Sequence, residues 1–431
     1  MFKNLVNAFK TKEVRVKILL TLLLLLVYRI GCFLPIPGLQ VGAFVSATTE
    51  NSFLGLLNSI SGNSLSNGAF LALGVSPYIS ASIIVQLLSI AIPSWQRASK
   101  EGEEGRKRIS KYTRYTALIL SIAQAVGIVL AFGNIIHPAA LWQGAPSWLI
   151  STIVAIVLVA GGMFTVWLGE RISDIGVGNG LSLLIFVGIL SSAGTALINS
   201  LTNVASDLSY LWNILVFLVA VLIIFTLIVF VDSAERKVPV QYAKQIKGRK
   251  MYGGQSTNIP IRVNASGVMP IIFASALLTF PQLIMSIFWP NSDAMAWYNT
   301  NMGAGSWPYI VLTAILILFF SYFYAQITFN PDDISKQIQQ NGGYIPGTRP
   351  GKPTADHLRK ISNRVILFGA IFLAFIALVP NLIFKAISGG DAGLINGFSA
   401  TGLLIIVSVA LEFDKQLEAQ LLMRNYRGFL K

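Results

Sequence analysis

The chain has 431 residues, of which 54% are hydrophobic and only 12% are charged, a composition that excludes an ordinary soluble domain. Its formal net charge of +14 suits anionic lipid headgroups and equally an acidic or RNA-bearing partner. Cys32 is its single cysteine, which excludes an internal disulfide and a cysteine-based metal site.

A helix needs about 20 predominantly apolar residues to cross a bilayer, and ten stretches of this sequence approach or reach that length. The sequence therefore predicts an all-α polytopic membrane protein with ten transmembrane helices. The predicted spans lie near Lys17–Pro35, Val75–Pro93, Tyr115–Gly133, Trp148–Leu168, Leu181–Ala196, Leu211–Val231, Val268–Trp289, Pro308–Phe329, Val365–Phe384 and Ser399–Phe413. Phe217, in the sixth span, is expected to face outward.

Ahead of the first span, apolar residues recur at helical spacing between lysines. This pattern predicts either a short helix on the headgroups or a solvated arm that orients the first span. Lys and Arg gather in this arm, in the tail, and in the gaps Gln96–Arg114, Arg236–Arg262 and Lys336–Arg364, whereas the alternate gaps hold only Lys385. Short cytoplasmic loops retain positive charge. Both termini and these basic gaps are therefore predicted to be cytoplasmic.

The sequence lacks the motifs of an enzyme. It contains no nucleophile elbow, phosphate loop or zinc-binding His pair, and His137 and His357 fall in gaps on opposite predicted faces. The run Gly176–Gly180 lies between two spans with no strand before it, which disfavours a dinucleotide site. We therefore expect no catalytic activity, metal or cofactor. Arg29 is the clearest ionisable residue inside a span, and pairing with a helix-end carbonyl or snorkelling outward is favoured over a transport role.

The second and seventh predicted spans begin alike. Gly74–Ser82 reads GVSPYISAS and Gly267–Ser275 reads GVMPIIFAS, so each has Gly-Val-x-Pro-x-Ile followed by small residues. These segments would head the second helices of two five-span halves, which lie in opposite orientation in the membrane. The echo therefore suggests an inverted repeat.

Five segments are more specific: GVSPYISASIIVQ, EGEEGRKRISKYTRY, IGVGNGLSLLI, RKVPVQ and GGYIPGTRPGKPT, which begin at residues 74, 101, 175, 236 and 342. They resemble the bacterial members of the SecY/Sec61-alpha family, and the similarity runs in order to Arg424-Asn425-Tyr426. The resemblance implies the central subunit of a protein-conducting channel, with halves 1–201 and 202–431 around an hourglass pore. Such a channel translocates unfolded secretory proteins and releases transmembrane segments laterally into lipid.

The resemblance also implies roles for particular residues. A constriction ring would comprise Val75, Ile79, Leu181, Ile185, Ile272 and Ile405. A segment at about 54–73 would fold back as a short, weakly held plug helix, with Ile60, Gly62, Asn63, Ser64, Leu65, Asn67, Gly68 and Phe70. A lateral gate would include Ser76, Pro77, Ser80, Gln86, Gln124, Pro270, Phe273 and Thr279. From their own chemistry, Gln86 and Gln124 are either packing polar residues or residues that tune gate opening.

Two cytoplasmic loops, at about 232–262 and 330–360, are predicted to receive partners. Their candidate docking residues are Arg236, Lys237, Lys244, Lys247, Arg249, Lys250, Tyr344, Arg349 and Lys352. Prolines and glycines around Arg349 should present its guanidinium on a stiff turn. The resemblance implies the SecA motor ATPase and the ribosome as partners there, small subunits like SecE and SecG in the membrane, and the bacterial plasma membrane as the location.

Two other functions remain open from the sequence. An ion-coupled secondary transporter would need a polar midplane site, for which the spans offer few candidates. A pore-free membrane insertase would leave no ion leak when residues 62–69 are removed.

Overall fold

The computed structural model describes residues 2–36, 58, 61–100, 102–131, 146–204, 209–242, 245–247, 250–252, 256–264, 267–288, 292–302, 306–387 and 400–428. Ile60 of the expected plug, and Lys244 and Arg249 of the expected docking loops, lie outside these residues.

Each predicted span coincides with a helix. The first half comprises α1 (Phe2–Lys10), α2 (Lys12–Gly31), α5 (Ser76–Ala91), α6 (Pro93–Lys100), α7 (Glu103–Ala131), α8 (Ser147–Ile175) and α9 (Gly180–Val204). The second comprises α10 (Ser209–Asp232), α11 (Met269–Phe288), α12 (Asp293–Asn301), α13 (Trp307–Thr328), α14 (Pro331–Gln340), α15 (Lys352–Ile387) and α17 (Ala400–Gly428). Within the described residues, six helices are long and apolar enough to cross a membrane: α7 to α10, α13 and α15. The apolar parts of α5 and α11 are shorter.

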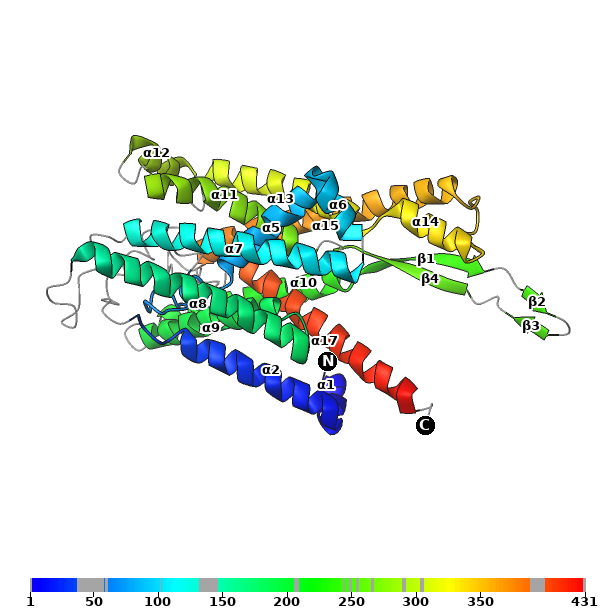
Figure 1. Ribbon diagram of the computed structural model, residues 1–431, viewed down its shortest axis with the longest axis horizontal. Coiled ribbons are helices and arrows are strands. Elements are labelled where there is room, and N and C mark those ends of the chain that lie inside the picture. The colour runs from blue at the N-terminus through cyan, green and yellow to red at the C-terminus, as the bar shows by residue number, and fades with distance from the viewer. Residues whose placement is uncertain are drawn as a thin grey trace.

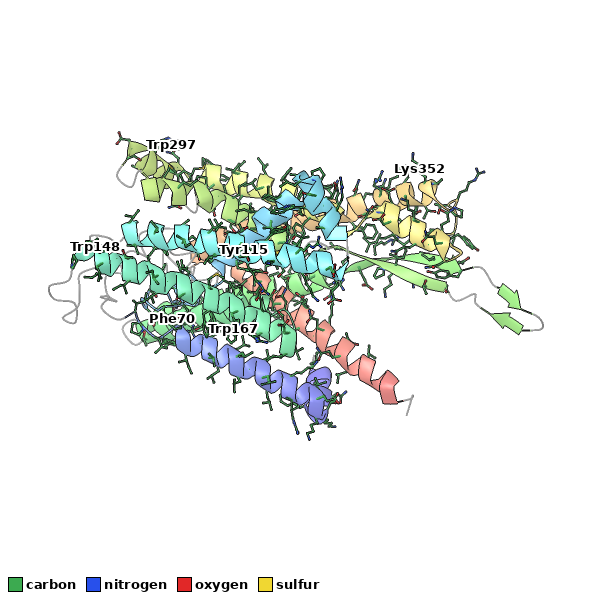
Figure 2. The ribbon with its side chains drawn as sticks, in the orientation of Figure 1. Phe70, Tyr115, Trp148, Trp167, Trp297 and Lys352 are labelled. Carbon is green, nitrogen blue, oxygen red and sulfur yellow. The ribbon has the colours of Figure 1, made fainter. Side chains whose placement is uncertain are left out.

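The long helices lie along one common direction (Figure 1). The N-terminus, the C-terminus and the longest strands lie towards the same end of the molecule, and α12 lies at the opposite end (Figure 1). Trp148 and Trp297 mark the α12 end, and Lys352 marks the other (Figure 2). Tryptophan is enriched at both interfaces of a membrane protein, whereas Lys and Arg gather on its cytoplasmic side, so the basic end is the one expected to be cytoplasmic.

The main hydrophobic core is formed jointly by both halves. One cluster contains buried side chains from α2, α5, α8, α9, α10, α11, α13, α15 and α17. Phe217 on α10 belongs to this cluster and is 0% exposed, so the expectation that it faces outward is wrong. The reason is that α10 packs against α9, α15 and α17.

The two basic segments that were expected to be loops contain β-strands. β1 (Glu235–Tyr242) pairs antiparallel with β4 (Ser256–Arg262) and with β5 (Gly343–Tyr344), in the order β4-β1-β5. β2 (Gln245–Lys247) and β3 (Lys250–Tyr252) form a second antiparallel pair. Val238 and Val240 are buried at every second position of β1, with an exposed residue between them, which is the alternation of a strand with one packed face.

This small sheet has its own core. Val238, Val240 and Ile261 from the sheet pack with Ile338 of α14 and Leu358 of α15. Ile345, directly after β5, joins the same cluster. Two segments about a hundred residues apart in the sequence therefore form one folded unit outside the apolar helices.

The predicted N-terminal helix is present as α1. Its Ala8 is 0% exposed and packs in a cluster with Val14, Val177 and Leu417, while Phe9 remains 42% exposed. One face of α1 thus packs on the protein, against α17, and another stays open.

Candidate functional site

The six candidate ring residues meet in the main core. Val75 caps the N-terminus of α5 and Ile79 lies one turn further, while Ile272 and Ile405 come from α11 and α17. Leu181 and Ile185 come from α9. Val75, Ile185 and Ile405 are buried, and the other three pack against the same cluster. The structure therefore brings together branched apolar side chains from both halves, and none of them can form a side-chain hydrogen bond.

The echo between the second and seventh spans extends to backbone geometry. Gly74 has φ +52° two residues before α5 begins, and Gly267 has φ +61° two residues before α11 begins. Pro77 and Pro270 each occupy the second position of their helix. Positive φ favours glycine, and proline is tolerated in the first turn because its missing N–H would be unpaired there anyway. The same sequence pattern thus builds the same helix start in each half.

The segment expected to form the plug, at about 54–73, precedes α5. Its described part, residues 61–73, consists mainly of turns, not the helix expected there, and Asn58 alone is helical. Gly62, Asn63 and Gly68 adopt φ values of +71°, +66° and +59°, which lets the chain reverse repeatedly. Leu65 is 1% exposed, and Ser64 is also buried.

The described residues of this segment make several hydrogen bonds to the residues around them, where few anchoring contacts were expected. Asn63 donates from Nδ2 to Oγ1 of Thr195 on α9 at 2.8 Å. The N–H of Ile36 donates to the carbonyl of Gly68 at 2.8 Å, and the N–H of Phe70 donates to Leu34 at 3.1 Å. Backbone groups and the side-chain amide of Asn63 therefore hold the segment in place.

Phe70 ends the segment against α8. Its ring centroid lies 6.3 Å from that of Phe164, and its carbonyl lies so close to Gly161 that a Cβ there would come within 1.8 Å of the oxygen. Figure 2 shows Phe70 beside the helices of the first half. Asn67 completes the set by donating to the carbonyl of Cys32 at 3.4 Å.

Arg29 pairs with a backbone carbonyl, as expected, but that carbonyl lies in a turn and not at the end of a helix. Its guanidinium donates to the carbonyl of Gly62 at 2.8 Å, and its Cζ lies 4.6 Å from the ring centroid of Phe33. No local pattern indicates this partner, because 33 residues separate Arg29 from Gly62.

The candidate gate residues lie where α5 and α7 face α11 and α13. The hydroxyl of Tyr324 on α13 donates to Oε1 of Gln86 on α5. The ring of Tyr324 packs edge-on against Phe273 of α11, with centroids 5.2 Å apart. α11 itself packs against α7. This seam between the halves is closed.

The other candidate gate residues differ in their surroundings. Pro77 and Pro270 are buried at their helix starts, and Ser76 and Ser80 are half-buried. Gln124 on α7 is 7% exposed, and its Oε1 has no hydrogen-bond partner among the described residues. Thr279 belongs to α11, but its side chain is outside the description.

The candidate docking residues that are described lie on the surface of the small sheet and its neighbours. Arg236, Lys237, Arg349 and Lys352 are exposed. Tyr344 on β5 is 41% exposed and donates to Gln241 on β1 at 2.9 Å. Lys247 and Lys250 lie on β2 and β3, and nothing is described of their side chains.

Arg349 lies on a constrained turn. Gly347 and Gly351 flank it with φ +83° and +96°, and Thr354 donates from Oγ1 to the carbonyl of Arg349 at 2.7 Å. The backbone carbonyl is thus held while the side chain is exposed, and a guanidinium presented in this way is suited to binding carboxylate or phosphate.

Comparison with known proteins gives a consistent result. The model of the SecY family matches residues 69–413. Curated relatives called protein translocase subunit SecY are 40% identical in Halalkalibacterium halodurans and Mycobacterium tuberculosis, and 41% identical in Streptomyces galbus, each over 100% of both chains.

Solved structures show the same fold. One described as a protein conducting channel aligns with TM-score 0.64 at 20% identity, covering 94% of this chain and 91% of the other. Another, described as showing that the plug domain of SecY stabilises the closed channel and maintains a membrane seal, aligns with TM-score 0.63 at 21% identity over the same shares. Sec61 from a canine ribosome–channel complex aligns with TM-score 0.62 at 19% identity, again over 94% and 91%.

Proposed function

The chain belongs to the SecY family, and from that premise we propose how its residues carry out the work of a protein-conducting channel. The chain is the channel-forming subunit of a protein translocase. In our proposal, unfolded secretory proteins cross the membrane through the ring of Val75, Ile79, Leu181, Ile185, Ile272 and Ile405. The segment at about 54–73, which we call the plug and whose described residues are Asn58 and 61–73, closes this ring at rest.

One observation supports the ring above all others: four helices, two from each half, bring branched apolar residues into a single cluster. An apolar constriction excludes water and ions by dewetting, and it offers no hydrogen bond that would hold a sliding polypeptide. Because the ring is shared between the halves, a movement that separates the halves also widens it.

Lateral release would use the seam between α5 and α7 on one side and α11 and α13 on the other. An apolar segment of about 20 residues that meets lipid through an open seam partitions outward, while a polar one continues through the pore. A solute transporter would instead need a polar, compact midplane site, and the apolar ring residues do not provide one.

The small sheet would be the docking platform for the chain's cytoplasmic partners, which we propose to be a SecA-like motor ATPase and the ribosome. Arg236, Lys237, Arg349 and Lys352 would meet acidic protein surface or RNA phosphate. We further propose small membrane subunits like SecE and SecG, anionic lipids, and a bacterial plasma membrane with both termini in the cytoplasm. The shared end of the two termini and the sheet supports this orientation (Figure 1).

Site-directed crosslinking tests the pore. In a Cys32→Ser chain, a photoreactive residue would replace Ile185, and a secretory precursor would be stalled during transit. The matched control places the same residue at Leu222 of α10, which is 64% exposed. Crosslinks to the mature part of the precursor from position 185 and not from 222 would support passage through the ring. Equal crosslinking at both, or none with stalling confirmed, would favour the pore-free insertase.

A further inference from the structure

We propose that Arg29 is a positioning residue that latches the plug to the first half of the channel and thereby sets how readily the pore unseals. This inference rests on the proposed function, because it assigns to Arg29 the task of holding the segment that closes the ring. Three observations support it. Arg29 on α2 donates a hydrogen bond to Gly62 of the plug. Asn63 of the plug donates to Thr195 on α9, and the plug's hydrogen bonds end on residues of the first half.

The first contact is close and specific. The guanidinium of Arg29 donates to the carbonyl of Gly62 at 2.8 Å. A Cβ at Gly62 would come within 2.7 Å of the same guanidinium and 3.0 Å of the backbone of Gly188 on α9. Gly62 is thus wedged between α2 and α9, and only glycine allows the close approach at φ +71°.

The charge of Arg29 and the apolar environment of the span both strengthen this hydrogen bond. A hydrogen bond with a charged donor is stronger than one between neutral groups, and an apolar environment strengthens it further. Lipid tails cannot solvate the charge of Arg29, so the guanidinium needs a polar partner within the protein. Phe33 supports the guanidinium from one side, with its ring centroid 4.6 Å from Cζ.

The second contact is independent of the first. Asn63, the next residue along the plug, donates to Thr195 on α9 at 2.8 Å and accepts from Ser192 at 3.5 Å. Asn63 itself has φ +66°, a conformation that costs energy for a residue with a side chain and that these contacts help to hold.

All of these contacts point to one half of the channel. Within the described residues, the hydrogen bonds that leave segment 61–73 end on residues 29–36, 58, 74, 76, 192 and 195, all of them in the first half. The ring, in contrast, draws residues from both halves. Separation of the halves would therefore widen the ring while the plug stays attached to the first half, and unsealing needs a further step that breaks the Arg29–Gly62 bond.

The chain carries a natural reporter of that step. Cys32 is 0% exposed, and its Sγ lies 3.8 Å from the carbonyl of Ser61 in the plug. Because it is the single cysteine of the sequence, thiol labelling of the protein reports on this position alone. Release of the plug uncovers Cys32, so its labelling rate measures how often the latch opens.

The experiment uses the channel complex reconstituted in lipid vesicles. Three quantities are measured for each variant: the rate at which a membrane-impermeant maleimide labels Cys32, the passive efflux of iodide, and the translocation of a precursor with an intact signal sequence. Arg29→Gln removes the charge and keeps a polar side chain. The matched control is Arg171→Gln, because Arg171 also stacks on an aromatic ring, with its Cζ 5.8 Å from the Trp167 centroid, but its side chain is exposed.

We expect Arg29→Gln to raise both the labelling rate and the efflux by about tenfold, the factor that corresponds to loss of about 1.4 kcal/mol, while translocation continues. Arg29→Lys should give an intermediate result because it retains the charge without the planar fork. Thr195→Val, which is close in volume, should shift labelling and efflux in the same direction by a smaller factor. Arg171→Gln should change neither.

The inference is overturned if Arg29→Gln and Thr195→Val both translocate normally and leave Cys32 labelling and efflux at the wild-type rate. It is also overturned if Arg29→Gln loses translocation at normal protein levels with no rise in labelling, since that would indicate a structural role in α2. If Arg29→Gln does not assemble, Arg29→Lys and Thr195→Val provide the same test. Absence of translocation in the wild-type chain would instead count against the proposed function.

Discussion

The hydroxyl of Tyr324 on α13 donates a hydrogen bond to the side-chain carbonyl of Gln86 on α5, and this bond joins the two halves across their seam. Tyr324 belongs to the second half and Gln86 to the first, so the bond must break whenever the seam opens. Phe273 packs against the Tyr324 ring and shields the contact.

Tyr324→Phe should make the seam easier to open. The substitution removes the hydroxyl but keeps the ring contact with Phe273, and a net loss of about 1 kcal/mol is typical for one hydrogen bond. We expect export of precursors with defective signal sequences to rise several-fold. Gln86→Leu should have the same effect, and the double substitution should add little, because both remove one interaction. Unchanged export of defective precursors in both single variants would show that this bond does not restrain the gate.

Gln124→Leu should increase the stability of the protein. Oε1 of Gln124 is buried without a partner among the described residues, and an unsatisfied buried polar atom costs about 1–3 kcal/mol. Leucine of similar size removes that cost, so the free energy of unfolding in detergent should rise by about 1 kcal/mol. Gln86→Leu is the control, since Gln86 has a partner to lose. A decrease in stability for Gln124→Leu would mean that its amide is paired in the membrane.

Leu358→Ala should unfold the small sheet without disturbing the membrane helices. Leu358 is 0% exposed within the separate core of the sheet, and truncation of a buried leucine costs about 2–5 kcal/mol. We expect limited proteolysis between residues 232 and 262 to accelerate strongly. Leu367→Ala on the same helix is the control, because Leu367 is 45% exposed. Equal proteolysis of the two variants would contradict an independent core.

Arg349→Ala should weaken docking and leave stability unchanged. Its side chain is exposed, and the turn is held through its carbonyl by Thr354, so the backbone should keep its shape. We expect motor-driven translocation at limiting ATPase concentration to fall about tenfold, which corresponds to about 1.4 kcal/mol, and to recover when the ATPase is in excess. Lys352→Ala, a neighbouring exposed cation, should have a smaller effect. No recovery at high ATPase concentration would point to a role after docking.

The transmembrane architecture could be predicted from the sequence because hydropathy and positive charge act locally. Each predicted span became a helix, since an apolar run of sufficient length has no other way to pair its backbone in lipid. The family could be recognised from five short segments, and the full-length relatives confirm it. Local chemistry also placed the two glycine–proline helix starts correctly.

Features that depend on distant contacts were missed. The partner of Arg29 lies 33 residues away and the sheet joins residues 241 and 344, so neither follows from a local pattern. Phe217 was misplaced because a helix that is apolar on all sides does not reveal which face meets protein and which meets lipid. The strand at 235–242 did carry a local signal, the alternation of Val238 and Val240, but the charges around it favoured a loop.

The pairing of β5 with β1 has a mechanical consequence. β1 follows α10 after two residues, and β5 leads through the Arg349 turn into α15, so the sheet bridges the two chain segments that flank α11, α12 and α13. A force applied by a partner at Arg349 would therefore act on paired strands. It would be transmitted through the paired strands to α10 and α15, the helices that precede and follow the gate helices α11 and α13 in the chain.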